Sequence, residues 1–415
     1  MKTWCVAVLS LILTCSLRAE FAIRDGDTVV FLGDSITAAR GYGKVVENYT
    51  LLRYPDRRVR FINAGWGGDT AAGGAARFER DVLSHGATLV TVAYGVNDIG
   101  WGGKADDEHK QKYLNGVRDI VTQCRNRNVR VFICSAAITG ADPEKSENDY
   151  LQRMCDDGMA LSRSLGGGAI DVQRSMREIQ KRIWAANREA KDDKDKHTLH
   201  AADGIHLNDL GQLAMGFAIL KGLGAPAEVS LVTIDAGAGR VAEASGCKVS
   251  ELKVSTEGVE FHRLDEGLPF NLGPLGALQF RFIPIPDQLN RYMLAVKGLS
   301  PGRYELTVAG REVGTWPAER LGEGINISSA TPDGWVPGGP WDAQAATLII
   351  LTDSRNQLVQ ADKLSGLYLG GNPNLAEASQ RIAGINERME ALQRLVVKPV
   401  PYRFVLKRLP PSSRP

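Results

Sequence analysis

The sequence predicts an α/β domain with a doubly wound parallel sheet, followed by a small β-sandwich and a C-terminal helical hairpin. Three observations lead to this prediction. Short apolar runs alternate with helical segments between residues 22 and 224. From residue 231 to about 330 the chain changes to short alternating strands broken by Gly and Pro, and helical periodicity returns between residues 341 and 396. Together these shifts divide the 415-residue chain into an α/β domain and two additions.

The first part contains five apolar runs of strand length. They are Thr28–Leu32, Val59–Asn63, Thr88–Tyr94, Val129–Ser135 and Ala169–Val172. Between the third and fourth lies a helical segment whose apolar side chains share one face: Tyr113, Val117, Ile120, Val121 and Cys124. Near-continuous apolar strands separated by amphipathic helices are typical of a parallel sheet covered on both faces. This three-layer, flavodoxin-like arrangement is the fold expected for residues 22–224.

The middle part has the two-residue period of β-strands. In "RYELTVAGREVGTW", Tyr304, Leu306 and Val308 fall on one face, and Ala309-Gly310 makes a turn. Several strands of this kind predict a small β-sandwich over residues 231–330.

Two helical segments follow, joined by "LGGNPN", and predict a hairpin over residues 341–396. The second carries an apolar stripe of Ile382, Ile385, Met389 and Leu392, which predicts packing on its neighbour or on the α/β domain. Residues 397–415, which end in "PPSSRP", are expected to form a C-terminal tail.

The N-terminus has the pattern of a signal peptide over residues 1–19. Met1-Lys2 precedes an apolar run from Trp4 to Leu17, too short for a comfortable membrane span, and cleavage is expected after Ala19. We therefore expect a secreted or periplasmic protein with no membrane span after leader removal. The formal net charge of +2 gives no indication of a nucleic-acid or anionic membrane partner.

Four cysteines remain after leader removal. Cys124, Cys134, Cys155 and Cys247 have a spacing that fits no metal or redox motif. We interpret them as buried thiols or an incidental disulfide bridge.

Polar residues that can do chemistry follow directly after the predicted strands. Ser35 ends "GDS" after the first strand, Gly68 lies in "NAGWGGDT" after the second, and Asn97 lies in "GVND" after the third. Asp203 and His206 open "DGIHLNDLGQLA" after the last strand and its long helical segment. Because ligands of doubly wound sheets bind beyond the carboxyl ends of the strands, these residues are expected to converge at one edge.

These four segments resemble, in order and spacing, the sequence blocks of the SGNH (GDSL-type) hydrolases. "GDS" resembles the first block, with Ile36 in place of the family's usual Leu. Gly68 matches the glycine of the second block, Asn97 the asparagine of the third, and Asp203-x-x-His206 the last. The resemblance covers residues 22–224, about half of the chain, and implies a serine esterase. It does not account for the β-sandwich or the hairpin.

The residue types support the same chemistry. A serine hydroxyl needs a base to become a nucleophile, and His206 is the candidate base for Ser35. Asp203, three residues earlier, can accept the other imidazole N–H and fix the tautomer. The Ser35 and Gly68 backbone N–H groups and the Asn97 side-chain amide are the candidate oxyanion-hole donors. This mechanism proceeds through an acyl-enzyme and uses neither metal nor cofactor.

Each of these residues also has a purely structural interpretation. Ser35 could cap a helix, Gly68 could serve a turn, and Asn97-Asp98 could form an Asx turn. We interpret Asp34 as structural, bonding nearby loop backbone. A metal cluster of His197, His200, Asp203 and His206 is the rival for His206, but their three-residue spacing differs from the i, i+4 pairing of helical zinc ligands.

Three further side chains border the predicted site. Trp66 and Trp101 are possible substrate contacts, through stacking on a sugar ring or packing on an acyl chain, or they plug the domain edge. Arg40 is interpreted as solvated, with binding of an anionic group as the alternative. The sequence and the family resemblance together predict an exported serine ester hydrolase, a carbohydrate O-acetylesterase that acts on a small-molecule or polysaccharide ester. The alternatives are a lysophospholipase or short-chain lipase, an O-acyltransferase, and a non-catalytic carbohydrate-binding envelope protein. Oligomeric state stays open.

Overall fold

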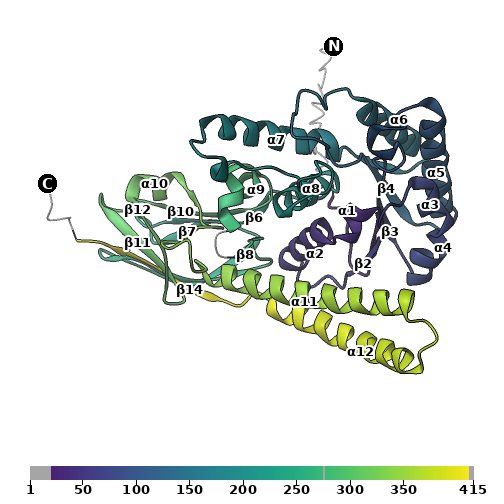
Figure 1. Ribbon diagram of the computed structural model, residues 1–415. Coiled ribbons are helices and arrows are strands. Elements are labelled where there is room, and N and C mark those ends of the chain that lie inside the picture. The colour runs from purple at the N-terminus through teal and green to yellow at the C-terminus, as the bar shows by residue number, and fades with distance from the viewer. Residues whose placement is uncertain (1–19, 274–275, 411–415) are drawn as a thin grey trace, which may run out of the picture.

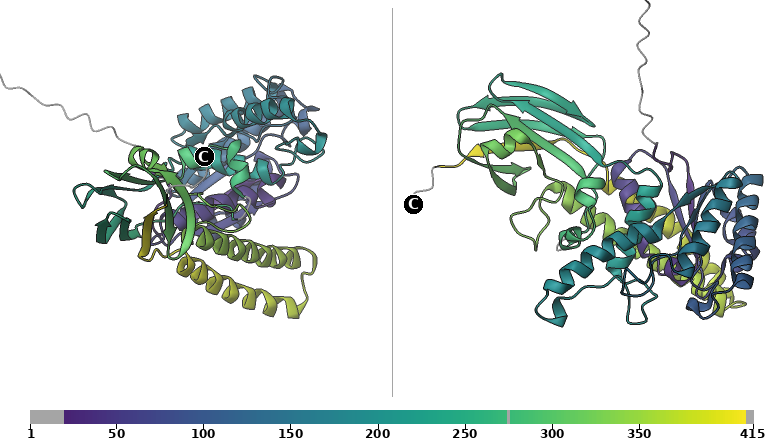
Figure 2. Two further views of the ribbon diagram at one scale, coloured as in Figure 1. Left: turned by 90° about the vertical axis from the view of Figure 1, so that its left-hand side faces the viewer. Right: turned by 90° about the horizontal axis from the view of Figure 1, so that it is seen from above.

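The computed structural model describes residues 20–273 and 276–410 (Figure 1). The expected signal peptide, residues 1–19, lies outside the described residues. The described chain forms an α/β domain, a two-sheet β region and a long helical hairpin that runs along the α/β domain (Figures 1 and 2). In the described ranges no helix combines the length and hydrophobicity needed to cross a membrane.

The α/β domain is built on one five-stranded parallel sheet in the order β2-β1-β3-β4-β5, which confirms the predicted fold class. Its strands are β1 (Thr28–Gly33), β2 (Arg60–Gly65), β3 (Leu89–Ala93), β4 (Arg130–Cys134) and β5 (Gly168–Ile170). Its helices are α1 (Ser35–Ala38), α2 (Gly41–Arg53), α3 (Ala71–Ala76), α4 (Phe78–Asp81), α5 (Asp107–Asn126), α6 (Tyr150–Ser164), α7 (Val172–Glu189) and α8 (Asp209–Gly222). Two separate apolar cores flank the sheet: α2, α7 and α8 contribute to one, and α3, α5 and α6 to the other. A sheet buried on both faces explains why its strands are apolar at nearly every position.

The β region consists of two sheets in the orders β13-β10-β6-β7 and β12-β11-β14-β9-β8. The strands are β6 (Glu228–Asp235), β7 (Arg240–Ser245), β8 (Cys247–Ser255), β9 (Gly258–Asp265), β10 (Arg291–Lys297), β11 (Arg303–Val308), β12 (Arg311–Pro317), β13 (Ile325–Asn326) and β14 (Tyr402–Arg408). Two short helices, α9 (Ile285–Gln288) and α10 (Ala318–Glu323), accompany them. All pairs are antiparallel except β6 with β10. Buried aromatic side chains of Phe261, Tyr292 and Phe404 lie in its core.

The prediction of a C-terminal tail over residues 397–415 is wrong for residues 402–408. These residues form β14, which lies in the middle of the second sheet between β9 and β11. Phe404 and Leu406 point to the same face of the strand and are fully buried there, whereas Arg403 and Lys407 point to the other face and are exposed. The hairpin is therefore inserted between two strands of the β region.

The hairpin consists of α11 (Pro340–Tyr368) and α12 (Pro373–Val396), and it packs against α2 of the α/β domain. A buried ion pair joins them: both carboxylate oxygens of Glu47 accept from Arg355 at 2.7 Å. Gln393 of α12 also donates to Glu47, at 2.9 Å. The expected apolar stripe on α12 does not make this contact, since Ile385 and Leu392 are 37% and 47% exposed. Buried polar side chains make this contact, while Trp341, Ala345 and Leu348 of α11 belong to the apolar core that α2 also shares.

The four cysteines are free and buried. Burial raises the pKa of the Cys124, Cys134 and Cys155 thiols to about 12. They are therefore unreactive apolar side chains of the core.

Candidate active site

The carboxyl ends of the neighbouring strands β2, β1 and β3 bring three of the predicted blocks side by side. Gly33, the last residue of β1, pairs with Gly65 of β2 on one side and with Ala93 of β3 on the other. The loops that carry Ser35, Gly68 and Asn97 leave the sheet from this common point. The sheet topology thus brings these three loops together at one edge, as the sequence predicted.

Ser35 is the first residue of α1, and its neighbour Asp34 is the helix cap. The Asp34 carboxylate accepts the backbone N–H of Ile36 at 2.9 Å, which is the structural part expected for this residue. Because Asp34 performs the capping, the Ser35 hydroxyl is not used for it. Burial of the Asp34 side chain raises its pKa to about 6.

The Ser35 hydroxyl, His206 and Asp203 form a continuous hydrogen-bonded chain. Ser35 Oγ lies 2.9 Å from His206 Nε2, and His206 Nδ1 lies 2.5 Å from Asp203 Oδ2. The other oxygen of Asp203 accepts the backbone N–H groups of Ile205 and His206, each at 2.9 Å, so the carboxylate is held by its own loop. The bond from His206 and these two backbone bonds lower the pKa of Asp203 to about 2. Asp203 is thus ionised and oriented to hold the imidazole with Nε2 toward Ser35.

The Asn97 amide is fixed by bonds at both ends. Trp101 Nε1 donates to Asn97 Oδ1 at 2.9 Å, and Asn97 Nδ2 donates to the Asp69 carbonyl at 3.0 Å. An indole N–H can only donate, so Oδ1 must face Trp101 and the NH₂ group must face the glycine loop. One N–H of that group remains for an oxyanion. Trp101 also packs edge-on against the His206 ring, with centroids 5.8 Å apart.

Gly68 adopts a φ of +73°, a conformation that favours glycine. Its loop is anchored by a residue that the sequence analysis missed. Arg77 donates to the Gly33 and Ala64 carbonyls at the ends of β1 and β2, at 3.2 and 2.8 Å, and to the Asp69 carboxylate at 2.9 Å. Arg77 therefore joins the ends of both strands to the loop that carries Gly68, one of the candidate oxyanion donors. No local pattern marks this arginine, because its partners lie up to 44 residues away.

Comparison with known proteins gives the family of this domain. Residues 31–214 match the sequence model of the GDSL-like Lipase/Acylhydrolase family. The α/β domain belongs to the SGNH/GDSL hydrolases. The chain is accordingly a serine ester hydrolase, as the "GDS" block predicted.

Two similar proteins show how far the likeness extends. An acetylxylan esterase of Geobacillus stearothermophilus is 23% identical over 227 residues, which cover 49% of this chain and 96% of that protein. The solved structure of a gut microbial diltiazem-metabolizing enzyme superposes with a TM-score of 0.79 at 22% identity, covering 94% of this chain and all of that one. This solved protein therefore shares the fold over nearly the whole chain.

The histidines of the alternative metal cluster have different surroundings in the SGNH/GDSL domain. His200 is buried and its Nε2 donates to the Ile138 carbonyl at 2.7 Å, while the ring of His197 packs against Phe282. Burial also lowers the pKa of both imidazoles. Within residues 20–273 and 276–410, no group of three or more His, Cys, Asp or Glu side chains is placed to hold a metal ion.

Asp98, beside Asn97, has the structural part that the sequence suggested. Its Oδ1 accepts the backbone N–H of Ala71 at the start of α3, at 3.0 Å. Burial raises the pKa of Asp98 to about 7. Asp98 therefore holds the loop after β3 to the first residue of α3.

Trp66 and Trp101 lie in different surroundings. Trp66 is half-buried between Arg80 and Lys363, whose cationic groups lie 5.8 and 5.3 Å from its ring centroid. Trp101 is 54% exposed and borders the catalytic residues directly. Of the two, only Trp101 combines exposure with contact to His206.

The interpretation of Arg40 as solvated is wrong. Arg40 is only 7% exposed, because α11 covers it and its guanidinium donates to Asn356 at 3.1 Å. The covering residue lies 316 positions along the chain, which no local pattern in the sequence can reveal.

A small cavity of about 230 Å³ adjoins the candidate active site. Trp101 and Ile205, the neighbour of His206, line it together with the apolar side chains of Val96, Ile99 and Leu151. Its volume lies below the roughly 300–1,000 Å³ of sites that enclose drug-sized ligands. It can take a short acyl group or part of one sugar ring.

Proposed function

We propose that this chain is an exported carbohydrate O-acetylesterase that acts through an acyl-enzyme. The observation that carries the proposal is the unbroken hydrogen-bonded chain from Ser35 through His206 to Asp203. Each link has the length of a strong hydrogen bond, and the Asp203 carboxylate is ionised at neutral pH because of its low pKa.

In the proposed reaction, Ser35 Oγ attacks the ester carbonyl while His206 Nε2 takes the hydroxyl proton. Asp203 stabilises the imidazolium that forms. The negative oxygen of the tetrahedral intermediate accepts bonds from the Ser35 and Gly68 backbone N–H groups and the Asn97 amide. As the intermediate collapses, His206 gives its proton to the leaving alkoxide, and the acyl group stays on Ser35. Water activated by His206 then attacks the acyl-enzyme, which releases the acid and restores the serine.

Two observations favour a short acyl group on a carbohydrate. The apolar cavity beside His206 is too small to enclose a long acyl chain. Trp101 presents an exposed aromatic face at the site, a surface suited to a sugar ring. The similar protein from Geobacillus stearothermophilus is an acetylxylan esterase, which agrees with the same substrate class. Export is proposed from the signal-peptide pattern of residues 1–19.

The test compares three substrate classes on the purified mature protein. Acetate release from acetylated xylan oligosaccharides, fatty-acid release from a lysophospholipid, and hydrolysis of p-nitrophenyl esters of increasing acyl length are measured in parallel. The proposal predicts acetate release from the oligosaccharides and a kcat/KM that falls as the acyl chain lengthens. Preference for long acyl esters or for the lysophospholipid would overturn the carbohydrate assignment. Acetyl transfer to an added sugar faster than hydrolysis would make the enzyme an acyltransferase.

A further inference from the structure

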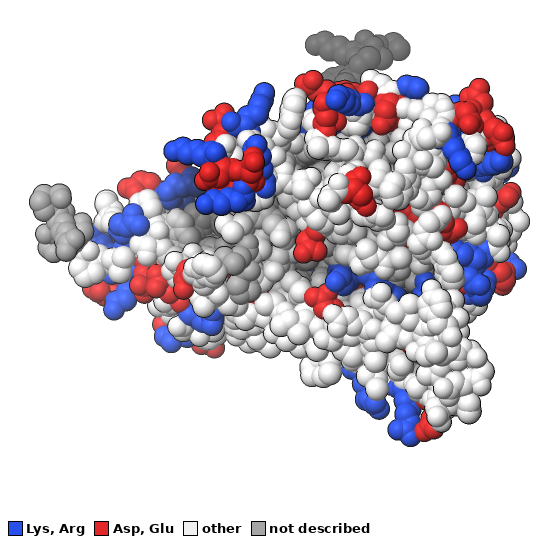
Figure 3. All heavy atoms as spheres, viewed as in Figure 1, with Lys and Arg blue, Asp and Glu red and all other residues white. Residues whose placement is uncertain are grey.

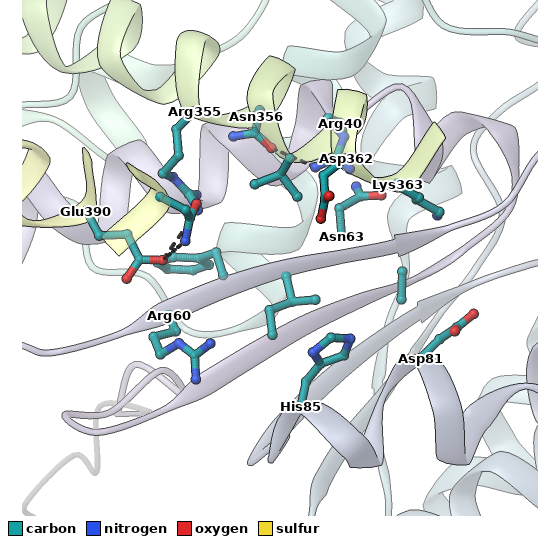
Figure 4. Close-up of a pocket in the computed structure, with 15 residues that line it drawn as sticks. Arg40, Arg60, Asn63, Asp81, His85, Arg355, Asn356, Asp362, Lys363 and Glu390 are labelled. Atoms are coloured by element: carbon teal, nitrogen blue, oxygen red, sulfur yellow. Dashed lines mark hydrogen bonds and ion pairs between the residues drawn. The ribbon is translucent and has the colours of Figure 1, made fainter. Parts of the chain in front are cut away.

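A second cavity, of about 350 Å³, lies between the hairpin and β2. Residues 60–64 of β2, the edge strand of the parallel sheet, line one side. Asn356 and Lys363 of α11 line the other side, and Arg40 reaches in from the start of α2 (Figure 4). Lys and Arg side chains also gather along the line where α11 meets the α/β domain (Figure 3). The cavity is thus separate from the apolar cavity beside His206.

Two cations face this cavity without a carboxylate partner. Arg40 is nine-tenths buried, its guanidinium donates to the Asn356 amide oxygen, and its Nε has no hydrogen-bond partner among the described residues. Lys363 Nζ donates to the Gly65 carbonyl at 2.8 Å. In the described chain, neither cation forms an ion pair. Removing a charge from water without a counter-ion costs free energy, so both groups would be stabilised by pairing with an anion.

The electrostatic surroundings strengthen this conclusion. Burial lowers the pKa of Lys363, and the neighbouring Arg40 and Arg77 guanidinium groups lower it further. Burial likewise lowers the pKa of Arg40; Arg355 adds to the effect, and Glu47 opposes it more weakly. Each cation therefore lies in a positive potential that a bound anion would relieve.

Nearby carboxylates are engaged elsewhere. Glu47 and Glu390 both pair with Arg355, and Asp81 pairs with Arg77 at 2.8 Å. Glu47 and Asp81 attract Arg40 and Lys363 from a distance, but these acidic groups form their ion pairs with other arginines.

One further carboxylate and one further cation belong to the lining. Asp362 accepts a hydrogen bond from Ser379, and Arg60 lies exposed at the rim. Among the described lining residues that form no ion pair, Arg40, Arg60 and Lys363 outnumber Asp362. The cavity keeps a net positive charge.

We propose that this cavity is a binding site for a small organic anion, whose carboxylate or phosphate pairs with Arg40 and Lys363. Its volume is at the lower end of the range for small-molecule sites, which suits a monosaccharide-sized acid such as a uronic acid or a sugar phosphate. Guanidinium and ammonium groups bind both oxyanions through charge-assisted hydrogen bonds. The site does not depend on the esterase activity, because it shares none of the residues proposed for catalysis.

Isothermal titration calorimetry on the full-length mature protein tests the proposal. Glucuronate, glucose 6-phosphate, inorganic phosphate and neutral glucose are the probes, and the first two separate the carboxylate from the phosphate source. We expect saturable binding of at least one of the three anions and none of glucose. Lys363→Met keeps the side-chain stem and removes the charge, so it should weaken binding at least tenfold. Lys363→Arg should restore it. The matched control, Lys112→Met, removes an exposed lysine of α5 that pairs with Glu108 and should change nothing.

Three results would overturn the proposal. They are the absence of binding by all three anions, binding of glucose as tight as that of the anions, and an unchanged affinity in a folded Lys363→Met protein. If Lys363→Met fails to fold, the salt dependence of wild-type binding decides the question. Affinity should fall from about 0.1 M to about 1 M NaCl because salt screens the ion pairs, and a constant affinity would refute the site.

Discussion

Replacing Trp101 by Phe removes one hydrogen-bond donor from the candidate active site and keeps an aromatic ring. Trp101 Nε1 donates to Asn97 Oδ1 at 2.9 Å, and the ring packs against His206 with centroids 5.8 Å apart. Phenylalanine can keep the packing but not the donation. The Asn97 amide, a proposed oxyanion donor, would then be held at one end only, by the Asp69 carbonyl.

The expected loss follows from the strength of that single bond. A neutral hydrogen bond contributes about 0.5–1.5 kcal/mol, which corresponds to roughly a 2- to 13-fold decrease in kcat if all of it serves to orient the amide. Removing the amide itself by Asn97→Ala should lower kcat by a factor of about 10²–10³. KM should change little in either variant, because the oxyanion forms only as the reaction proceeds.

Steady-state hydrolysis of p-nitrophenyl acetate by both single variants and the double variant measures this coupling. Once Asn97 is gone, Trp101→Phe should have no further effect on kcat. Full multiplication of the two single losses would refute the positioning role of Trp101. Trp335→Phe, on an exposed loop of the β region, is the matched control and should keep wild-type kinetics. Equal melting temperatures of all variants would exclude misfolding as the cause.

Three further changes test other parts of the structure. Burial raises the pKa of Asp98 to about 7, above its usual value near 3.9. The folded protein therefore favours the protonated carboxyl group. The stability that this group contributes is full below about pH 4 and is lost as the pH rises through 7. Asp98→Asn should therefore show a smaller fall in melting temperature than wild type between pH 5 and pH 8, and an identical fall would contradict the assignment. Glu47→Gln leaves the buried Arg355 without its main partner and should lower the free energy of unfolding by about 3–5 kcal/mol in urea titrations. Glu108→Gln, in an exposed pair, is the control and should leave the free energy of unfolding nearly unchanged. EDTA should leave the hydrolysis rate unchanged, and strong inhibition would favour the histidine cluster.

Local sequence signals were sufficient for the α/β domain and for the residues at its edge. Apolar runs of strand length determine the buried parallel strands, and each short block that follows a strand must emerge at the same edge of the sheet. Ser35, Asn97 and His206 could be proposed together for that reason. The sequence does not reveal the distances between them, nor that Asp34 caps the helix so that the Ser35 hydroxyl can bond to His206.

Features that depend on remote partners could not be predicted. β14 is a seven-residue strand with charged neighbours, and its pairing partners lie about a hundred residues and more upstream. Arg40 looked solvated because the helix that covers it comes more than three hundred residues later. Arg77 and Trp101 act through contacts that only the folded loops create. Sequence patterns report which face of an element is apolar, but not which polar side chains meet across the fold.

Hydrolysis of p-nitrophenyl acetate by wild type and Ser35→Ala, measured side by side, tests the central claim most directly. Ser164→Ala, which removes an exposed hydroxyl at the end of α6, is the control. The hydrogen-bonded chain from Ser35 to Asp203 predicts that Ser35→Ala loses the activity at an unchanged melting temperature, while the control keeps it. A Ser35→Ala protein as active as wild type would show that this serine is not the nucleophile.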